Sequence, residues 1–93
     1  MSSKTETYHV KVYGLVQGVG FRLATARQAH ALKITGWVRN LEDGSVEAWI
    51  QGSDKQVDDM LQWFNFGPPQ ANVSRLEIER IDTDQRFDTF AYR

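Results

Sequence analysis

Apolar and polar residues alternate near the start of the chain and predict a half-buried strand over 7–13, with Tyr8, Val10 and Val12 on its apolar face. A glycine-rich stretch follows. Residues 21–32 then contain helix formers without internal glycine or proline, so we expect the first helix there. Its apolar periodicity is weak. The expected inner positions of this helix are Phe21, Ala24, Gln28 and Leu32.

The same alternation returns over 35–40 and 45–51, on either side of the turn sequence Glu42-Asp43-Gly44. These two segments predict a hairpin. Trp37 and Trp49 alternate to its polar face, where they either pack against each other across the hairpin or bind a partner.

A second helix is predicted where Ser53-Asp54-Lys55-Gln56 fits a capping box, with the serine accepting from the backbone and the glutamine reaching back. Gly67 and the two prolines after it end this helix. Residues 73–81 predict a long strand with a bulge, and 86–92 a short final strand. The inner face of the second helix is Val57, Met60, Leu61 and Phe64.

The predicted order is strand, helix, strand, strand, helix, strand, with a short strand appended. Two interlocked βαβ units of this kind form a ferredoxin-like α+β sandwich, with both helices on one face of an antiparallel sheet. The other face is then partly wet, in keeping with its polar and aromatic residues. We expect one domain over 1–93, with residues 1–6 flexible.

Composition narrows the class of protein. With 93 residues, 41% of them hydrophobic, the chain suits one small folded domain. Its net charge of −1 gives no overall attraction to nucleic acid or anionic membranes, and no apolar run is long enough to span a bilayer. The absence of cysteine excludes disulfides and a cysteine nucleophile. We expect a cytoplasmic location, because the first residues do not form a secretory signal, and a monomer as the simplest oligomeric state.

The segment from Gly14 to Arg22, Gly-Leu-Val-Gln-Gly-Val-Gly-Phe-Arg, lies between the first strand and the first helix. Its glycines allow positive φ, so that successive amide N–H groups can surround an anion beside the N-terminus of the helix. Arg22 adds a planar set of donors suited to phosphate oxygens. A tight structural turn with a solvated arginine is the alternative.

Three known phosphate-binding patterns do not fit this segment. A P-loop requires a lysine after the glycines, and none is present. A dinucleotide fingerprint requires a third glycine where this chain has Leu23. A cysteine phosphatase requires a cysteine.

A second run, Gly36-Trp37-Val38-Arg39-Asn40-Leu41-Glu42-Asp43-Gly44-Ser45-Val46-Glu47, follows across the predicted hairpin. Together with Gly14-x-Val16-Gln17-Gly18-Val19-x-Phe21-Arg22, it closely resembles the acylphosphatase family. The element order and the Gly67-Pro68-Pro69 stop match that family over nearly the whole chain. Leu23 stands where many relatives have an aromatic residue, which alters the wall of the pocket.

The resemblance implies hydrolysis of the carboxyl–phosphate bond of acyl phosphates, giving a carboxylate and inorganic phosphate. It implies that Arg22 binds the phosphoryl group and that Asn40 holds the attacking water. No metal or other cofactor is implied, and the only partners expected are the small-molecule substrate and phosphate. The resemblance also implies that the phosphoryl group is held by the backbone N–H groups of the loop Gln17, Gly18, Val19, Gly20 and Phe21.

Two other functions stay open at this point. The same loop could recognise a phosphorylated or carbamoylated ligand without turnover, as a binding module. RNA binding is a further alternative, because the RNA-recognition fold shares this topology, although no RNP1-like run is present.

Four residues outside the two signatures carry groups that could support the site or bind a metal. Thr25 lies one turn after Arg22, where its hydroxyl can support the water or the loop. The carboxylate of Arg93, after the last strand, is a candidate to hold Arg22 in place. His9 and His30 lack partners at metal-ligand spacing, and we assign them to surface or packing roles.

Overall fold

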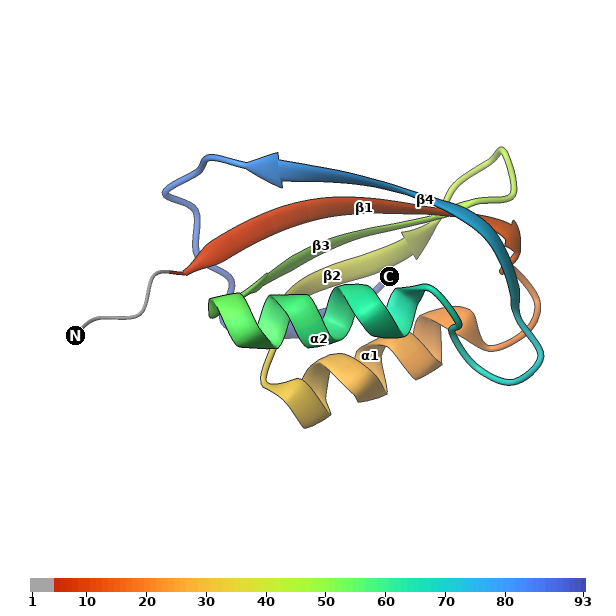
Figure 1. The fold of residues 1–93 in the computed structure, drawn as a ribbon, viewed down its shortest axis with the longest axis horizontal. Coiled ribbons are helices and arrows are strands. Elements are labelled where there is room, and N and C mark those ends of the chain that lie inside the picture. Colours follow the sequence, from red (N-terminus) through yellow and green to blue (C-terminus); the bar gives the residue numbers. More distant parts are fainter. Residues whose placement is uncertain (1–4) are drawn as a thin grey trace.

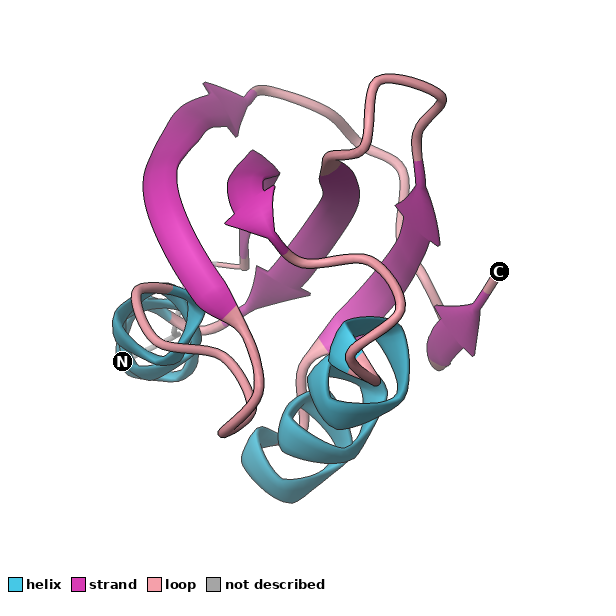
Figure 2. Cartoon of the chain, turned by 90° about the vertical axis from the view of Figure 1, so that its right-hand side faces the viewer, coloured by secondary structure: helices cyan, strands magenta, loops and turns pink. Residues whose placement is uncertain are grey.

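The computed structural model describes residues 5–93, and its five strands form one sheet in the order β4-β1-β3-β2-β5. Both helices cover the same face of this sheet (Figures 1 and 2), as the ferredoxin-like class predicts. The elements are β1 (Glu6–Leu15), α1 (Phe21–Leu32), β2 (Thr35–Asn40), β3 (Val46–Gly52), α2 (Asp54–Phe64), β4 (Asn72–Ile81) and β5 (Phe90–Tyr92).

The first four strands pair antiparallel, β1 with both β3 and β4, and β2 with β3. β5 pairs parallel to β2, which makes the sheet mixed. This last strand is shorter than the predicted segment 86–92 and begins at Phe90. The predicted bulge is present in β4, where the register with β1 passes from Arg75 to Val73 and leaves Ser74 without a partner.

The core lies between the sheet and the helix layer. The alternating positions of the strands supply one side of it, including Val10, Val12 and Val38, all fully buried. The predicted inner face of α2 is correct for Val57, Met60 and Phe64, with Leu61 partly buried beside them.

The predicted inner face of α1 is correct at Phe21, and Leu32 packs partly buried against the core, but the face is wrong at Ala24 and Gln28. The structure buries Thr25, Ala26 and Ala29, and leaves Ala24, Gln28 and Leu32 less deeply covered. Small alanine side chains let the helix lie close to the sheet. Thr25 is buried at no polar cost because its hydroxyl donates to the main-chain oxygen of Phe21 at 2.7 Å.

The expectation that residues 1–6 are flexible lies in part outside the described residues, for 1–4. For Glu6 the expectation of flexibility is wrong, because this residue is part of a strand. It pairs with Gly52 of β3 and begins β1.

Three connections meet at one end of the molecule, on the right in Figure 1: the β1–α1 loop, the β2–β3 turn and the α2–β4 loop. Figure 2 views the molecule from this end. Gly67, in the α2–β4 loop, has a φ of 67°. A Cβ added to it would lie 2.4 Å from the ring of Phe21, the first residue of α1.

Replacing Gly67 with alanine is therefore expected to destabilise the fold. Positive φ disfavours a side chain, and the buried Phe21 ring, stacked on Phe64 at 6.3 Å, has no free space into which to move. We expect a loss of about 2–4 kcal/mol in the free energy of unfolding, measured by urea denaturation. Gly44→Ala is the control, since it also has positive φ but faces open space. Equal losses in the two variants would contradict a steric role for Phe21.

Candidate active site

The β1–α1 loop owes its shape to two glycines. Gly18 and Gly20 have φ angles of 76° and 78°, in the left-handed region that favours glycine. No atom lies within 4 Å of a Cβ added at either position. The loop therefore needs glycine for its backbone conformation and not for lack of space, and both positions stay open to an approaching ligand.

This conformation leaves a run of amide N–H groups without acceptors. Within residues 5–93, no backbone N–H from Gln17 to Leu23 donates to another group of the chain, and the first return bond of the helix is from Ala24 to the oxygen of Gly20. α1 has no side-chain cap and no acidic residue in its first turn. The N-terminus of the helix therefore adds its positive dipole end to the loop's donors, as in anion-binding sites.

A hollow of about 180 Å³ lies at this point and brings together most of the predicted residues, although Gln17 and Val19 do not line it. Its walls include Gly18 and Gly20 of the loop, Arg22 of α1, Asn40 at the end of β2, and Tyr92 of β5. The two signatures that are separate in the sequence thus meet in one small space. Its volume suits a phosphate group with a water molecule.

Arg22 is held from the side of β5. Its Nη1 donates to the main-chain oxygen of Arg93 at 2.6 Å, and its guanidinium lies 4.8 Å from the centre of the Tyr92 ring. These contacts orient the planar group while leaving its other donors available. The expected contact between the C-terminal residue and Arg22 is present in the structure.

Asn40 is the last residue of β2, where it pairs with Val46 of β3. Its side chain is exposed, and its amide makes no hydrogen bond with any residue in the described part of the chain. An amide in this state has one acceptor and two donors to offer.

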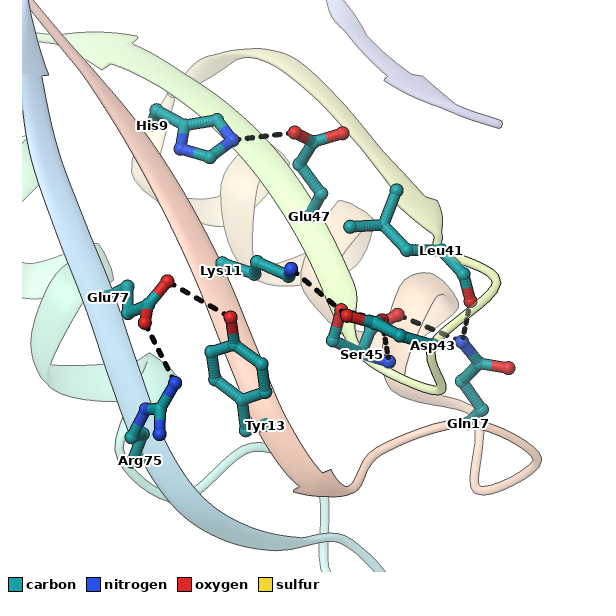
Figure 3. Close-up of polar contacts among 10 residues, drawn as sticks. All are labelled: His9, Lys11, Tyr13, Gln17, Leu41, Asp43, Ser45, Glu47, Arg75 and Glu77. Atoms are coloured by element: carbon teal, nitrogen blue, oxygen red, sulfur yellow. Dashed lines mark hydrogen bonds and ion pairs between the residues drawn. The ribbon is translucent and has the colours of Figure 1, made fainter.

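The side chain of Gln17 has a function that the sequence did not reveal. Its Nε2 donates to the main-chain oxygens of Leu41 and Ser45, at 2.7 and 2.9 Å (Figure 3). Gln17 therefore joins the β1–α1 loop to the turn that follows Asn40. The family resemblance predicts only a backbone contact between Gln17 and the substrate. The Gln17 side chain binds the hairpin in addition. No local sequence pattern predicts a contact between residues so far apart in the chain.

The β2–β3 turn is fastened at a second point by Asp43, whose carboxylate accepts from the backbone N–H of Ser45 at 2.9 Å and also from its hydroxyl. Lys11 of β1 lies 3.0 Å from the same carboxylate (Figure 3). The two bonds from Ser45, with Lys11 beside them, lower the pKa of Asp43 to about 2. The Asp43 carboxylate therefore stays ionised at neutral pH and keeps its contacts with Ser45 and Lys11.

Shortening Gln17 should loosen the two parts of the site from each other. In Gln17→Ala the oxygens of Leu41 and Ser45 lose this donor, and Asn40, beside Leu41 in the chain, loses a fixed position relative to the loop. For the acyl phosphate hydrolysis that the resemblance implies, we expect kcat to fall about tenfold to 100-fold, since small displacements of a positioned group have effects of this size. The Michaelis constant should change less. The exposed Gln62→Ala of α2 is the control, and equal kcat in the two variants would contradict the role of Gln17.

Phe21 lines the small hollow, whereas Val19 does not. The Phe21 ring is buried against Trp63 and Phe64, with ring centres 5.6 and 6.3 Å apart, and this packing anchors the end of the loop. Val19 is partly buried against the core.

The polar and aromatic residues on the helix-free face form contacts of their own. The two tryptophans stack across the hairpin, with ring centres 6.1 Å apart, which agrees with the packing alternative. His9 and Arg39 both bind Glu47, at 2.6 and 2.7 Å. Partial burial of Glu47 works against ionisation, but these two hydrogen bonds outweigh it and lower its pKa.

Two other kinds of feature are absent from residues 5–93. No group of three or more His, Asp or Glu side chains could hold a metal ion. No helix there is long and apolar enough to cross a membrane.

Comparison with known proteins assigns a family to this geometry. The acylphosphatase family model matches residues 8–92. An acylphosphatase of Burkholderia mallei is 57% identical over 90 residues, which are 97% of this chain and 92% of the relative. The structure of an acylphosphatase from Coxiella burnetii superposes with a TM-score of 0.91 at 38% identity, covering 96% of this chain and 93% of the other.

A second solved structure extends the likeness to a more distant sequence. The acylphosphatase from Bacillus subtilis has a TM-score of 0.91 at 28% identity, and the match covers 95% of this chain and 98% of that one. The loop, the hairpin and the fold that carries them thus have one common explanation: the chain belongs to the acylphosphatase family.

Proposed function

We propose that the chain hydrolyses acyl phosphates, with the phosphoryl group held by the loop amides from Gln17 to Phe21 and by Arg22, and with the attacking water held by Asn40. The family relationship supports the reaction. The observation that carries the assignment of roles is the meeting of unpaired amides, a fixed guanidinium and a free carboxamide around one hollow of about 180 Å³.

The reaction demands little covalent chemistry from the protein. A carboxylate is a good leaving group, so it needs no general acid. Phosphoryl transfer passes through a loose transition state, in which charge is spread over three equatorial oxygens and little proton transfer has occurred. A strong base is therefore not required, and a phosphate oxygen can take the water's proton as the new P–O bond forms.

What remains is positioning and charge stabilisation. Amides fixed by the backbone, and an arginine fixed by Arg93 and Tyr92, stabilise the equatorial oxygens without rearranging during the reaction. Asn40 can orient a water molecule in line with the breaking bond by donating to it or accepting from it.

The direct test incubates the wild-type protein with acetyl phosphate and measures the release of inorganic phosphate. We expect turnover well above the spontaneous rate and competitive inhibition by inorganic phosphate, because the product occupies the same loop. Tight phosphate binding without turnover would contradict hydrolysis and favour the binding-module alternative. If the protein neither binds phosphate nor turns over acetyl phosphate, the proposed site is wrong.

We also propose that the protein acts as a monomer in the cytoplasm, on a small molecule and not on nucleic acid. Sedimentation of the purified chain tests the oligomeric state. A salt-dependent interaction with RNA would contradict the assignment of its substrate class.

A further inference from the structure

A second hollow, of about 520 Å³, adjoins the proposed phosphate site. Gly20 and Leu23 line both hollows, whereas Asn40 lines only the smaller one. The outer surface of α1 forms one wall of the larger hollow, and Trp63 with the segment Gly67–Pro69 forms the opposite wall. The two hollows thus adjoin at the beginning of α1, where they share these two residues.

The geometry of the reaction gives this second hollow a use. In an in-line displacement the leaving group departs on the side of phosphorus opposite the attacking water. With water at Asn40, the acyl group points away from β2. The larger hollow lacks Asn40, begins at the same loop, and so is placed to receive the part of the substrate that leaves as a carboxylate.

The walls of this hollow are partly apolar. Leu23 is 46% exposed although it is a large aliphatic residue, and Trp63 is only partly buried. Pro68 and Pro69 continue the apolar wall and, with fixed backbone φ, lose little freedom when a ligand binds. A short hydrocarbon chain would cover these surfaces from water.

One cation lies along the same wall. Arg27 is one helical turn beyond Leu23 on the same side of α1. It makes no ion pair or side-chain hydrogen bond with any residue in 5–93. Helical side chains lean toward the N-terminus of their helix, so the aliphatic part of Arg27 runs toward Leu23, and its length allows the guanidinium to reach the part of the hollow nearest Gly20.

We infer that the larger hollow binds the acyl group of the substrate, and that Arg27 selects acyl groups carrying a second carboxylate beyond a short apolar spacer. This inference rests on the proposed hydrolysis. Arg27 lies seven residues, or about 10 Å along the helix axis, beyond Gly20. A four-carbon dicarboxylic monophosphate extends about 6 Å from phosphorus to its free carboxylate, and the arginine side chain spans the rest. A guanidinium can bind that carboxylate through two parallel hydrogen bonds.

The experiment compares succinyl phosphate with butyryl phosphate, which has the same number of carbons but a methyl group in place of the carboxylate. In Arg27→Gln we expect the ratio of the two kcat/KM values to fall about two- to fivefold, the range for an exposed ion pair. The change should lie in KM, since the contact is the same before and during reaction. High salt should reduce the wild-type ratio toward that of the variant.

Lys55→Gln is the matched control, because it removes one exposed positive charge from the first turn of α2, and α2 begins at the end of the helix layer opposite the three connections (Figure 1). Its ratio should equal that of the wild type. Leu23→Ala tests the apolar wall separately and should lower kcat/KM for butyryl phosphate at least twofold more than for acetyl phosphate.

Acetyl phosphate separates failure of this inference from failure of the proposed function. Turnover of all three substrates with an unchanged succinyl-to-butyryl ratio in Arg27→Gln would overturn the role of Arg27 alone. An unchanged butyryl-to-acetyl ratio in Leu23→Ala would overturn the acyl hollow. No turnover of any of the three by the wild type would overturn the hydrolysis on which both depend.

Discussion

Arg22→Ala is expected to lower kcat/KM for acetyl phosphate about 10³-fold or more. The guanidinium lies in the wall of the small hollow and is the charged group there that can match a phosphoryl group with several donors. Removing one preorganised donor from a developing anion typically costs about 10²–10³ in rate, and this change removes more than one. Arg22→Lys should recover little of the loss, since an ammonium group presents a point charge in place of a planar fork.

The control is Arg75→Ala, because Arg75 has contacts of the same kinds elsewhere. It lies 4.2 Å from the centre of the Tyr13 ring and binds Glu77 at 2.8 Å (Figure 3). We expect its kcat/KM to stay within about twofold of wild type, as is usual for exposed ion pairs away from a site. Circular dichroism and the urea midpoint must show Arg22→Ala folded. More than a tenth of wild-type kcat/KM in that folded variant would contradict the proposed role of Arg22.

Sequence patterns predicted the elements best where the signal is local. The alternation that places Val10 and Val12 inward is decided by neighbouring residues of one strand, and the structure confirms it. The capping box of Ser53 and Gln56 is equally local, and both of its hydrogen bonds are present.

The sequence was less informative where contacts between distant segments decide the result. The inner face of α1 is set by how closely the helix approaches β2 and β5, and this favours alanine and an internally bonded threonine over larger apolar residues. β5 gains its place by pairing parallel to β2, which no periodicity in so short a strand indicates. The resemblance identified the residues of the site, but the Gln17 contact that joins its halves appears only in the folded chain.

Asn40→Ala tests the second half of the site and should separate chemistry from binding. If Asn40 orients water, its loss should lower kcat about 100-fold, because the nucleophile is no longer held in line with phosphorus. The inhibition constant of inorganic phosphate should change less than about threefold, since the loop amides and Arg22 remain. A fall in kcat at nearly constant phosphate affinity identifies an interaction made mainly in the transition state.

Asn72→Ala is the matched control, an exposed asparagine at the start of β4 that also makes no side-chain hydrogen bond within residues 5–93. It should keep kcat within about twofold of wild type. Asn40→Asp adds a stricter condition, since a carboxylate can accept from water but repels the phosphoryl oxygens, so both kcat and phosphate affinity should fall. Near-normal kcat in folded Asn40→Ala would show that the water is held elsewhere, and would leave the loop and Arg22 as the whole of the catalytic apparatus.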